Sequence, residues 1–333
     1  MAELFSLPLS TPPMEAKSAD ELPMEKGIWQ YEPKWDGFRC LAFKSGDNVD
    51  LRAKSGKPLA RYFPEVVSIL RRVKIPALVV DGEIVIKRDG ETAFEALQMR
   101  LHPAESRIRK LSAATPATFI LFDMLVDDFG QIVVDKPLKE RRQKLGAFLR
   151  KFPIDGLELS PATTDSRTAK KWLSQSGHSS TDGVVAKLLR DAYSAGERTM
   201  VKVKRLRTAD CVVGGFRYLQ DSTDVGSLLL GLYNDGGLLD HVGFTSTISR
   251  DDRRTLTKQL EALQSPPGFT GNAPGGPSRW STGRSREWVP VKPELVAEVR
   301  FDHVTGDRFR HGTKFLRWRP DKDPKQCTFQ QLR

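Results

Sequence analysis

The sequence predicts an α+β protein of two domains, with sheets and helices first and a small β domain after them. Its 333 residues suffice for two domains with sizeable cores. Apolar and alternating patterns predict strands in the first part, over residues 28–51, 78–80, 84–86, 119–125, 183–187 and 201–204. Short strands around one helix follow, and they predict a small β domain, for which a Greek-key barrel is one fit. We therefore expect domains at residues 1–206 and 207–333.

The segments between these strands predict helices, turns and loops. Residues 1–25 are rich in Pro, Ser and charge and predict an irregular lead-in. Helix-starting prolines and helical apolar spacing predict helices over residues 64–73, 94–101, 137–150, 166–175 and 250–263. Asp81-Gly82-Glu83 predicts either a strand pair or one bulged strand. The second domain has expected strands over residues 211–218, 227–233, 238–244, 295–301 and 315–319, and a Pro/Gly/Ser-rich loop over 265–286.

The composition favours a polyanionic partner. The formal net charge is +11, from 53 Lys and Arg against 42 Asp and Glu, and cations that neutralise phosphates release counterions from nucleic acid. Charge alone does not separate DNA from RNA.

Cysteine usage and hydropathy indicate the compartment. Cys40, Cys211 and Cys327 lack metal spacing and predict cytosolic thiols, with neither a disulfide framework nor a zinc site. No apolar run is long enough to span a membrane. Residues Met1–Pro13 lack the basic start of a signal peptide, so we expect a reducing cytoplasm.

One segment, Glu32-Pro33-Lys34-Trp35-Asp36-Gly37-Phe38-Arg39, places a lysine, an acid–glycine turn and an arginine between strand-like runs. Asp-Gly between such runs also fits an ordinary hairpin with a solvated lysine. Four further segments follow in order, Asp-Gly-Glu at 81–83, Phe-Ile-Leu-Phe-Asp at 119–123, Asp-Gly-Val-Val-Ala-Lys at 182–187 and Met-Val-Lys-Val-Lys at 200–204.

A lysine in this setting is a candidate nucleophile. It must lose its proton, which costs about 4.6 kcal/mol at pH 7 from a reference pKa near 10.4. Neighbouring cations lower that cost, and the candidates are Arg39, Lys187, Lys202 and Lys204. Lys202 and Lys204 share one face of a strand, where they either bind phosphate or charge an exposed edge.

Three acids, Asp36, Glu83 and Asp182, are predicted ligands for Mg²⁺ (or Mn²⁺), because magnesium prefers oxygen ligands. Asp36 also fits simple turn chemistry, and Glu83 fits a solvated acid at a strand end. Phe122 is a candidate to cover one face of a purine, with a plain core aromatic as the alternative.

Taken in order, the five segments resemble the motifs of the covalent nucleotidyltransferases, which comprise ATP-dependent DNA ligases, RNA ligases and mRNA capping enzymes. The resemblance covers nearly the whole chain. Residues 94–101 and 308–312 resemble the bacterial ATP-dependent DNA ligases of the C type, which are related to the ligase domain of ligase D. The resemblance implies a nucleotidyltransferase domain with ATP-grasp-like antiparallel sheets, followed by an OB-fold domain.

The resemblance also implies a role for each motif residue. Lys34 would attack the α-phosphorus of ATP, expel pyrophosphate and carry AMP. The AMP would pass to the 5′-phosphate of a nick, and the 3′-hydroxyl would displace it to seal the strand. The other implied contacts are Glu32 or its backbone at adenine, Phe122 on the base, Arg39 and Glu83 at the ribose, Lys202 and Lys204 at the α-phosphate, Lys187 at phosphate oxygens, Asp182 at the metal, and Arg319, Asp321 and Lys322 at pyrophosphate.

Three departures modify this picture. Lys54 stands where many relatives have an arginine, so its phosphate contact lacks the directional fork of a guanidinium. Asp182 replaces a glutamate and, being one methylene shorter, favours a water-mediated metal contact. Met200 replaces an aromatic residue as a softer wall.

The expected substrate is nicked or broken duplex DNA, in repair or end joining. We expect the cleft between the domains and a loop with Arg279, Arg284 and Arg286 to grip the duplex, unless that loop is only solvated. The motifs begin near the N-terminus, which predicts a minimal two-domain ligase. We expect a monomer in the bacterial cytoplasm, at the nucleoid, and recruitment by a Ku-like end-binding protein is left open.

Two other function classes stay open at this point. An RNA ligase or a GTP-using capping-type transferase would use the same lysine chemistry. A nucleic-acid-binding OB protein with a decayed transferase core is the third alternative, although Lys34, Glu83, Lys202 and Lys204 are intact.

Overall fold

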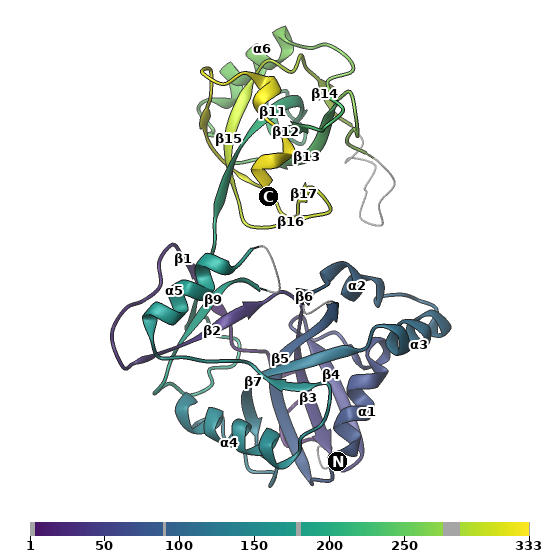
Figure 1. Cartoon of the computed structure of the whole chain (residues 1–333), viewed down its shortest axis with the longest axis vertical. Helices are drawn as coiled ribbons and strands as arrows, with labels where there is room; N and C mark the ends of the chain where they lie inside the picture. The colour runs from purple at the N-terminus through teal and green to yellow at the C-terminus, as the bar shows by residue number, and fades with distance from the viewer. Residues whose placement is uncertain (1–3, 89–90, 178–180, 276–286, 333) are drawn as a thin grey trace. The chain divides into compact units, whose positions relative to one another are not determined.

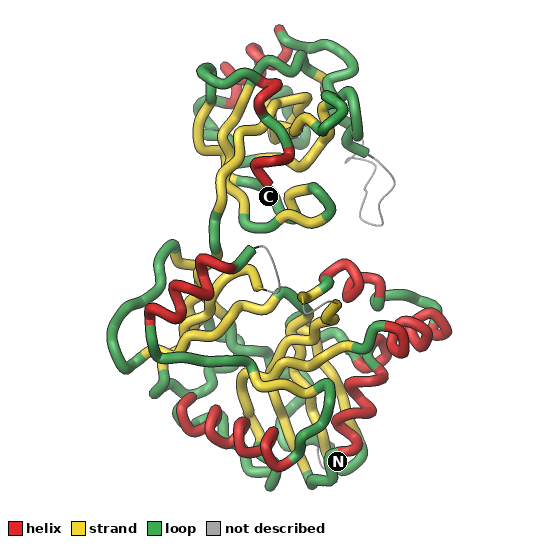
Figure 2. The backbone as a smooth tube through the Cα atoms, in the orientation of Figure 1, coloured by secondary structure: helices red, strands yellow, loops and turns green. Residues whose placement is uncertain are grey.

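The computed structural model describes residues 4–88, 91–177, 181–275 and 287–332. The chain divides into two compact units, Met1–Arg205 and Leu206–Arg333, which have separate hydrophobic cores. Figure 1 labels their helices and strands, and Figure 2 shows that both units mix helix with strand. No helix in the described part is long and apolar enough to cross a membrane.

Unit 1 is built on two sheets. The larger has the strand order β4-β3-β5-β7-β8, with β6 beside β5, and the smaller has the order β1-β10-β9-β2. Most neighbours are antiparallel, but β7–β8 and β1–β10 are parallel. The strands are β1 (Ala16–Ala19), β2 (Trp29–Trp35), β3 (Phe38–Ser45), β4 (Asn48–Ala53), β5 (Ala77–Arg88), β6 (Glu91–Thr92), β7 (Ala117–Val126), β8 (Leu157–Leu159), β9 (Thr181–Leu188) and β10 (Met200–Lys204).

Helices cover these sheets (Figure 1). Among them, α1 packs against β4 and β7, α4 against β7 and β8, and α5 against β2 and β9. The helices are α1 (Pro64–Arg72), α2 (Phe94–Met99), α3 (Glu105–Ala114), α4 (Leu138–Lys151) and α5 (Ser166–Gln175). Pro64 begins α1, where its missing N–H and fixed φ cost nothing. The predicted helices over 64–73 and 166–175 are thus confirmed.

Three local features differ from the expectations. The turn at Asp36-Gly37 does not close a hairpin, because β2 pairs with β9 and β3 pairs with β5. It carries the chain from one sheet to the other. The lead-in is not irregular throughout, since Ala16–Ala19 forms a strand beside β10. The helix α3 was not predicted, and it buries only Ile108.

The segment Asp81-Gly82-Glu83 lies within one strand, β5. A shift in the register between β5 and β7 falls between Asp81 and Gly82, so the interpretation as one bulged strand is confirmed. This strand lies between β3 and β7 in the larger sheet. The motif at 81–83 on β5 therefore lies between the end of the Lys34 motif, on β3, and the motif at 119–123, on β7.

Unit 2 is a small barrel. Its main strands follow the order β13-β12-β11-β15-β18, with β14 beside β11 and a separate pair, β16–β17. Thr245, at the end of β13, pairs with Thr313, beside β18, and its hydroxyl donates to the Thr313 carbonyl oxygen at 2.9 Å. This pairing joins the two ends of the sheet and closes the barrel.

The helix α6 (Arg253–Ala262) packs against β12. The strands are β11 (Arg207–Tyr218), β12 (Val225–Tyr233), β13 (Leu239–Thr245), β14 (Val289–Pro290), β15 (Val296–Phe301), β16 (Val304–Thr305), β17 (Arg308–Phe309) and β18 (Lys314–Trp318). Short strands and one interposed helix agree with the predicted small β domain.

Candidate active site

Three neighbouring strands of the smaller sheet place Lys34 among charged groups. Lys34 of β2 lies opposite Gly183 of β9, and Gly183 lies opposite Lys204 of β10. A side chain at Gly183 would collide with the carbonyl oxygen of Val203, so only glycine allows this close approach of β9 and β10. The strands therefore hold the two lysines on either side of one glycine.

Asp182, the neighbour of this glycine, pairs with both lysines. Its Oδ1 lies 2.8 Å from Lys34 Nζ and its Oδ2 lies 3.1 Å from Lys204 Nζ. Burial raises the pKa of Asp182, but the two ammonium groups outweigh burial and hold the pKa below its usual value. Burial, together with Lys34 and Lys204, lowers the pKa of Lys202 on β10. The surroundings of Lys34 thus combine one anion, Asp182, with two cations, Lys202 and Lys204.

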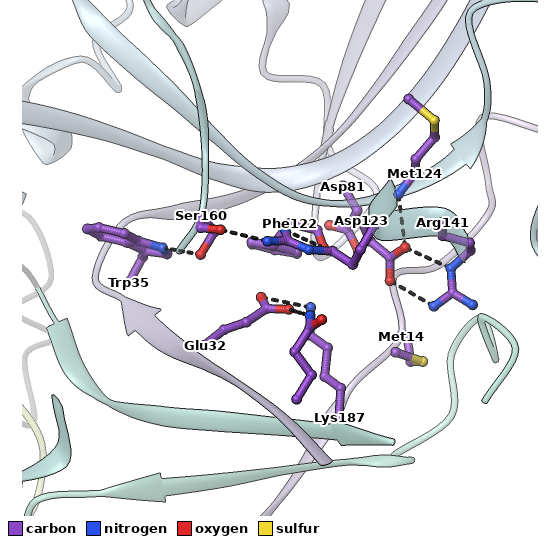
Figure 3. Close-up of polar contacts among 12 residues, drawn as sticks. Met14, Glu32, Trp35, Asp81, Phe122, Asp123, Met124, Arg141, Ser160 and Lys187 are labelled. Atoms are coloured by element: carbon purple, nitrogen blue, oxygen red, sulfur yellow. Dashed lines mark hydrogen bonds and ion pairs between the residues drawn. The ribbon is translucent and has the colours of Figure 1, made fainter. Parts of the chain in front are cut away.

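The carboxylate of Glu32 is held on both of its oxygens. Lys187 Nζ lies 3.0 Å from Oε2, and both side chains are buried (Figure 3). The amide of Gln30 donates to Oε1 at 2.7 Å. Lys187 also lies 4.5 Å from the ring centroid of Phe122, and the guanidinium of Arg39 lies at the same distance. Two cations thus contact one aromatic ring, which is buried and forms part of the pocket wall.

Arg39 is fixed by a carboxylate to which the sequence analysis gave no role. Its Nε and Nη2 donate to the two oxygens of Asp81 at 2.6 and 2.7 Å. Burial lowers the pKa of Arg39, but Asp81 raises it further and keeps the guanidinium charged. Asp81 is fully buried and the Arg39 side chain is 23% exposed, so the carboxylate side of this bidentate pair is shielded from solvent.

A single pocket collects most of the predicted nucleotide contacts. Its lining includes Glu32, Lys34, Arg39, Lys54, Glu83, Phe122, Lys187 and Lys202. The wall also includes residues 13–16 of the lead-in, which the sequence analysis did not assign to the site. Lys54 does not stand alone there, because its Nζ lies 3.0 Å from Glu15 Oε2. Lys204 does not line the pocket, and it forms an ion pair with Asp182.

The predicted metal ligands are not brought together as one cluster. Among the described residues no group of three His, Cys, Asp or Glu side chains is placed to hold a metal ion. Asp182 is engaged by two lysines, and Asp36 is buried and does not line the pocket. In the described part of the chain these acids therefore do not form a preorganised metal site.

Glu83 faces the pocket from β5 in an unusual electrostatic setting. Burial raises its pKa to about 7, and Asp81 and Asp36 act in the same direction, while Arg39 and Lys34 oppose them. A carboxyl group with such a pKa is only partly ionised near neutral pH, which is common at functional sites.

Replacing Glu83 by glutamine should stabilise the protein at pH 8 but not at pH 4. Since the folded pKa is about 7 and the reference value is 4.5, the wild type loses stability as the pH rises between these two values. Glutamine has no proton to lose, so the difference in unfolding free energy should grow to about 1–3 kcal/mol by pH 8. Urea unfolding of both proteins at pH 4, 6 and 8 measures it. A difference that does not change with pH would contradict the assigned cause.

The candidate pyrophosphate residues lie in unit 2. Arg319 Nη1 lies 3.0 Å from Asp210 Oδ1, and its Nη2 lies 2.9 Å from Asp321 Oδ2. The hydrogen bond from Arg319 is the main reason why the pKa of Asp321 falls to about 2. Lys322 lies 3.8 Å from Asp210. Arg279, Arg284 and Arg286 lie outside the described residues.

The site residues that the sequence analysis missed are Met14, Glu15, Asp81 and Tyr193. Asp81 belongs to a quoted motif, and its place beside Glu83 is the signal that could have found it. The other three sit in segments without apolar periodicity. Only long-range packing brings Met14 and Glu15 to the pocket wall and Tyr193 into contact with Met14.

Unit 1 has two sheets that share a pocket, and unit 2 is a small closed barrel. This is the architecture of the nucleotidyltransferases that carry an OB-like domain. The chain belongs to the ATP-dependent DNA ligases. The pattern described as "ATP dependent DNA ligase domain" matches residues 13–204, and the pattern described as "ATP dependent DNA ligase C terminal region" matches residues 221–322.

Named relatives agree with this family. The chain is 42% identical to DNA ligase C of Mycobacterium tuberculosis, over 98% of this chain and 96% of that one. It is 28% identical to the multifunctional non-homologous end joining DNA repair protein LigD of the same species, over 94% of this chain and 39% of that protein. Among solved structures, mycobacterial DNA ligase D complexed with ATP and MES is 27% identical, with a TM-score of 0.52, over 96% of this chain and 98% of that one.

These comparisons confirm three predictions. The protein is α+β, with a nucleotidyltransferase domain and an OB-like domain after it. It is an ATP-dependent DNA ligase, and its relatives include DNA ligase C and the ligase D protein.

Proposed function

We propose that the protein seals breaks in duplex DNA through a lysyl-AMP intermediate on Lys34, formed in the pocket of unit 1. One observation carries this proposal. Side chains from separate segments of the chain line the same pocket as Lys34, and they provide cations for phosphates, an aromatic ring for a base and carboxyl groups for hydroxyls. Phosphates, a flat base and hydroxyls are the groups that a nucleoside triphosphate presents together.

Lys34 Nζ loses a proton and forms a bond to the α-phosphorus of ATP, while the bond to the β-phosphate oxygen breaks and pyrophosphate leaves. An oxygen of the DNA 5′-phosphate then takes the AMP, and the phosphorus–nitrogen bond breaks. The 3′-hydroxyl attacks the 5′-phosphorus, loses its proton, and releases AMP as the new phosphodiester forms.

The side chains divide the remaining work. Lys202 and Lys204 hold α-phosphate oxygens, and Lys54 and Lys187 add positive charge. Lys202, Lys54 and Lys187 line the pocket, and Lys204 pairs with Asp182. Phe122 stacks on the base while Glu32 accepts from it, and Arg39 with Glu83 contacts the ribose. Asp182 is the counter-ion from which Lys34 must separate before it attacks.

A divalent cation, Mg²⁺ or Mn²⁺, would enter the site bound to the triphosphate of ATP. Magnesium keeps several waters and is often bound through one or two carboxylates together with substrate phosphates. Asp182 pairs with Lys34, and Asp36 and Glu83 are the other candidates, of which Glu83 lines the pocket. When bound, the cation would neutralise charge on the phosphates.

The two domains have separate tasks in this proposal. Residues 1–206 form the adenylyltransferase domain, and residues 207–333 form the OB-fold domain. Arg319, Asp321 and Lys322 serve the pyrophosphate side of the first step, and Arg279, Arg284 and Arg286 contact the duplex. The net charge of +11 supports binding to a polyanion.

The cellular role we propose is DNA repair by end joining, because one relative is a non-homologous end joining protein. Recruitment by a Ku-like end-binding protein is part of this proposal. So are a monomeric state and a bacterial cytoplasmic location at the nucleoid.

The mass of the intact protein tests this proposal first. Incubation with ATP and Mg²⁺ should add the mass of AMP, whereas GTP should add nothing, and the adduct should disappear on addition of a nicked DNA duplex as the nick is sealed. A GMP adduct would instead indicate capping chemistry, and sealing of nicked RNA alone would indicate an RNA ligase. No adduct on protein shown to be free of AMP would overturn the lysyl-AMP intermediate.

A further inference from the structure

Residues Pro13–Ala16 form one wall of the nucleotide pocket, and we call them the strap. The strap lies beside a segment far along the chain. Glu15 N–H donates to the Glu197 carbonyl at 2.8 Å, and Met200 N–H donates back to the Glu15 carbonyl at 3.2 Å. Directly after it, β1 pairs with β10, the strand of Lys202 and Lys204. The strap therefore depends on the segment around residue 200 for its position.

One side chain ties the strap to the larger sheet. The hydroxyl of Tyr193 accepts from the Met14 N–H at 3.0 Å and donates to Asp81 Oδ2 at 2.6 Å. Both Tyr193 and Asp81 are buried. Burial, with the charge of Asp81, raises the pKa of Tyr193 well above its usual range, so the phenol stays a donor at every pH used in an assay.

Asp81 passes this contact on to Arg39. The same carboxylate receives Nε and Nη2 of Arg39, and Nη2 also lies 3.3 Å from the Met14 carbonyl oxygen. Tyr193, Met14, Asp81 and Arg39 thus form a closed ring of hydrogen bonds. Arg39 in turn lies over the Phe122 ring. One phenol hydroxyl couples the strap, the ribose-side arginine and the base-side aromatic ring.

Tyr193 does not line the pocket itself. We propose that it is a positioning residue for lysine adenylylation, which holds Arg39 and the strap in the geometry that binds ATP. This inference rests on the proposed function of the pocket. Because the group acts on binding rather than on the reacting atoms, its loss should raise the KM for ATP much more than it changes the limiting rate.

The test compares Tyr193→Phe with a matched control. Phenylalanine removes one oxygen and leaves Asp81 bound to Arg39, so the fold should persist. Tyr31→Phe is the control, since Tyr31 is also buried and donates to a backbone carbonyl, that of Pro23, at 2.6 Å, but it does not line the pocket. Each variant loses one hydroxyl, which makes two hydrogen bonds in Tyr193 and one in Tyr31.

Rates of AMP–protein formation at varied ATP provide the readout. For Tyr193→Phe we expect the KM for ATP to rise about tenfold, the effect of one lost hydrogen bond to a charged partner, with less than a threefold change in the limiting rate. Tyr31→Phe should leave both values unchanged. Asp81→Asn should also raise the KM, and combining it with Tyr193→Phe should add little, because both changes break the same ring.

Two results would overturn the inference and are distinguishable from failure of the proposed function. If the wild type forms the AMP adduct and Tyr193→Phe has an unchanged KM, Tyr193 is only structural. Additive effects of Tyr193→Phe and Asp81→Asn would show that the two residues act separately. If the wild type itself forms no adduct, the proposed function fails and the inference fails with it.

Discussion

Lys34→Arg is expected to lower the rate of AMP-adduct formation by at least about 10⁴-fold. Losses on this scale are seen when a catalytic nucleophile is removed. Arginine keeps the positive charge that pairs with Asp182 at 2.8 Å in the wild type. Its guanidinium has a pKa above 12 and stays protonated, so it provides no nucleophilic nitrogen. The substitution thus separates charge from nucleophilicity at one position.

The assay is the intact mass after incubation with ATP and Mg²⁺. Lys17→Arg is the matched control, because Lys17 lies on β1 with an exposed side chain and does not line the pocket. The Lys34→Arg protein should still seal a nick that already carries AMP on its 5′-phosphate, since that step needs no lysine nucleophile. An AMP adduct on Lys34→Arg would show that another residue is the nucleophile.

Arg141→Ala is expected to destabilise unit 1 by about 3–5 kcal/mol, as removal of one partner from a buried ion pair does. Arg141 and Asp123 are each 1% exposed, and the guanidinium donates to both carboxylate oxygens at 2.8 and 3.0 Å (Figure 3). It also donates to the backbone carbonyls of Lys136 and Asp191. Alanine would leave Asp123 charged or protonated without a partner, and both carbonyls without this donor.

Urea unfolding with Arg109→Ala as control measures this effect. Arg109 also pairs with a carboxylate, that of Glu105, but is 76% exposed, so its loss should cost less than about 0.5 kcal/mol. Replacing both Arg141 and Asp123 by apolar residues should recover much of the stability, because no unpaired charge remains. An effect of Arg141→Ala as small as that of Arg109→Ala would show that the pair contributes little.

Sequence patterns located most of the pocket because its residues lie on strands in short motifs. Alternation along β10 put Lys202 and Lys204 on one face, and the Asp-Gly motif at 182–183 lies on the strand between β10 and β2. The hairpin interpretation of Asp36-Gly37 was wrong for a physical reason. A tight turn has the same local chemistry whether the next strand pairs with the last one or with another sheet.

Features that depend on distant partners could not be predicted. The strap gains its structure from residues near 200, and its own composition is typical of a loop. Tyr193 is one aromatic residue in an irregular segment, and only its bonds to Met14 and Asp81 distinguish it. The helix α3 buries only Ile108, so its amphipathic signal was too weak to detect.

The crossing at Asp36-Gly37 has a mechanical consequence. Lys34 belongs to the smaller sheet and Arg39 to the larger one, yet the peptide between them spans at most roughly 18 Å even when fully extended, at about 3.3–3.6 Å per residue. This maximum span of the connecting peptide limits how far the two sheets can shift against each other. A mutation that weakens the packing of either sheet should therefore lower the melting temperature well before it separates the lysine from the arginine.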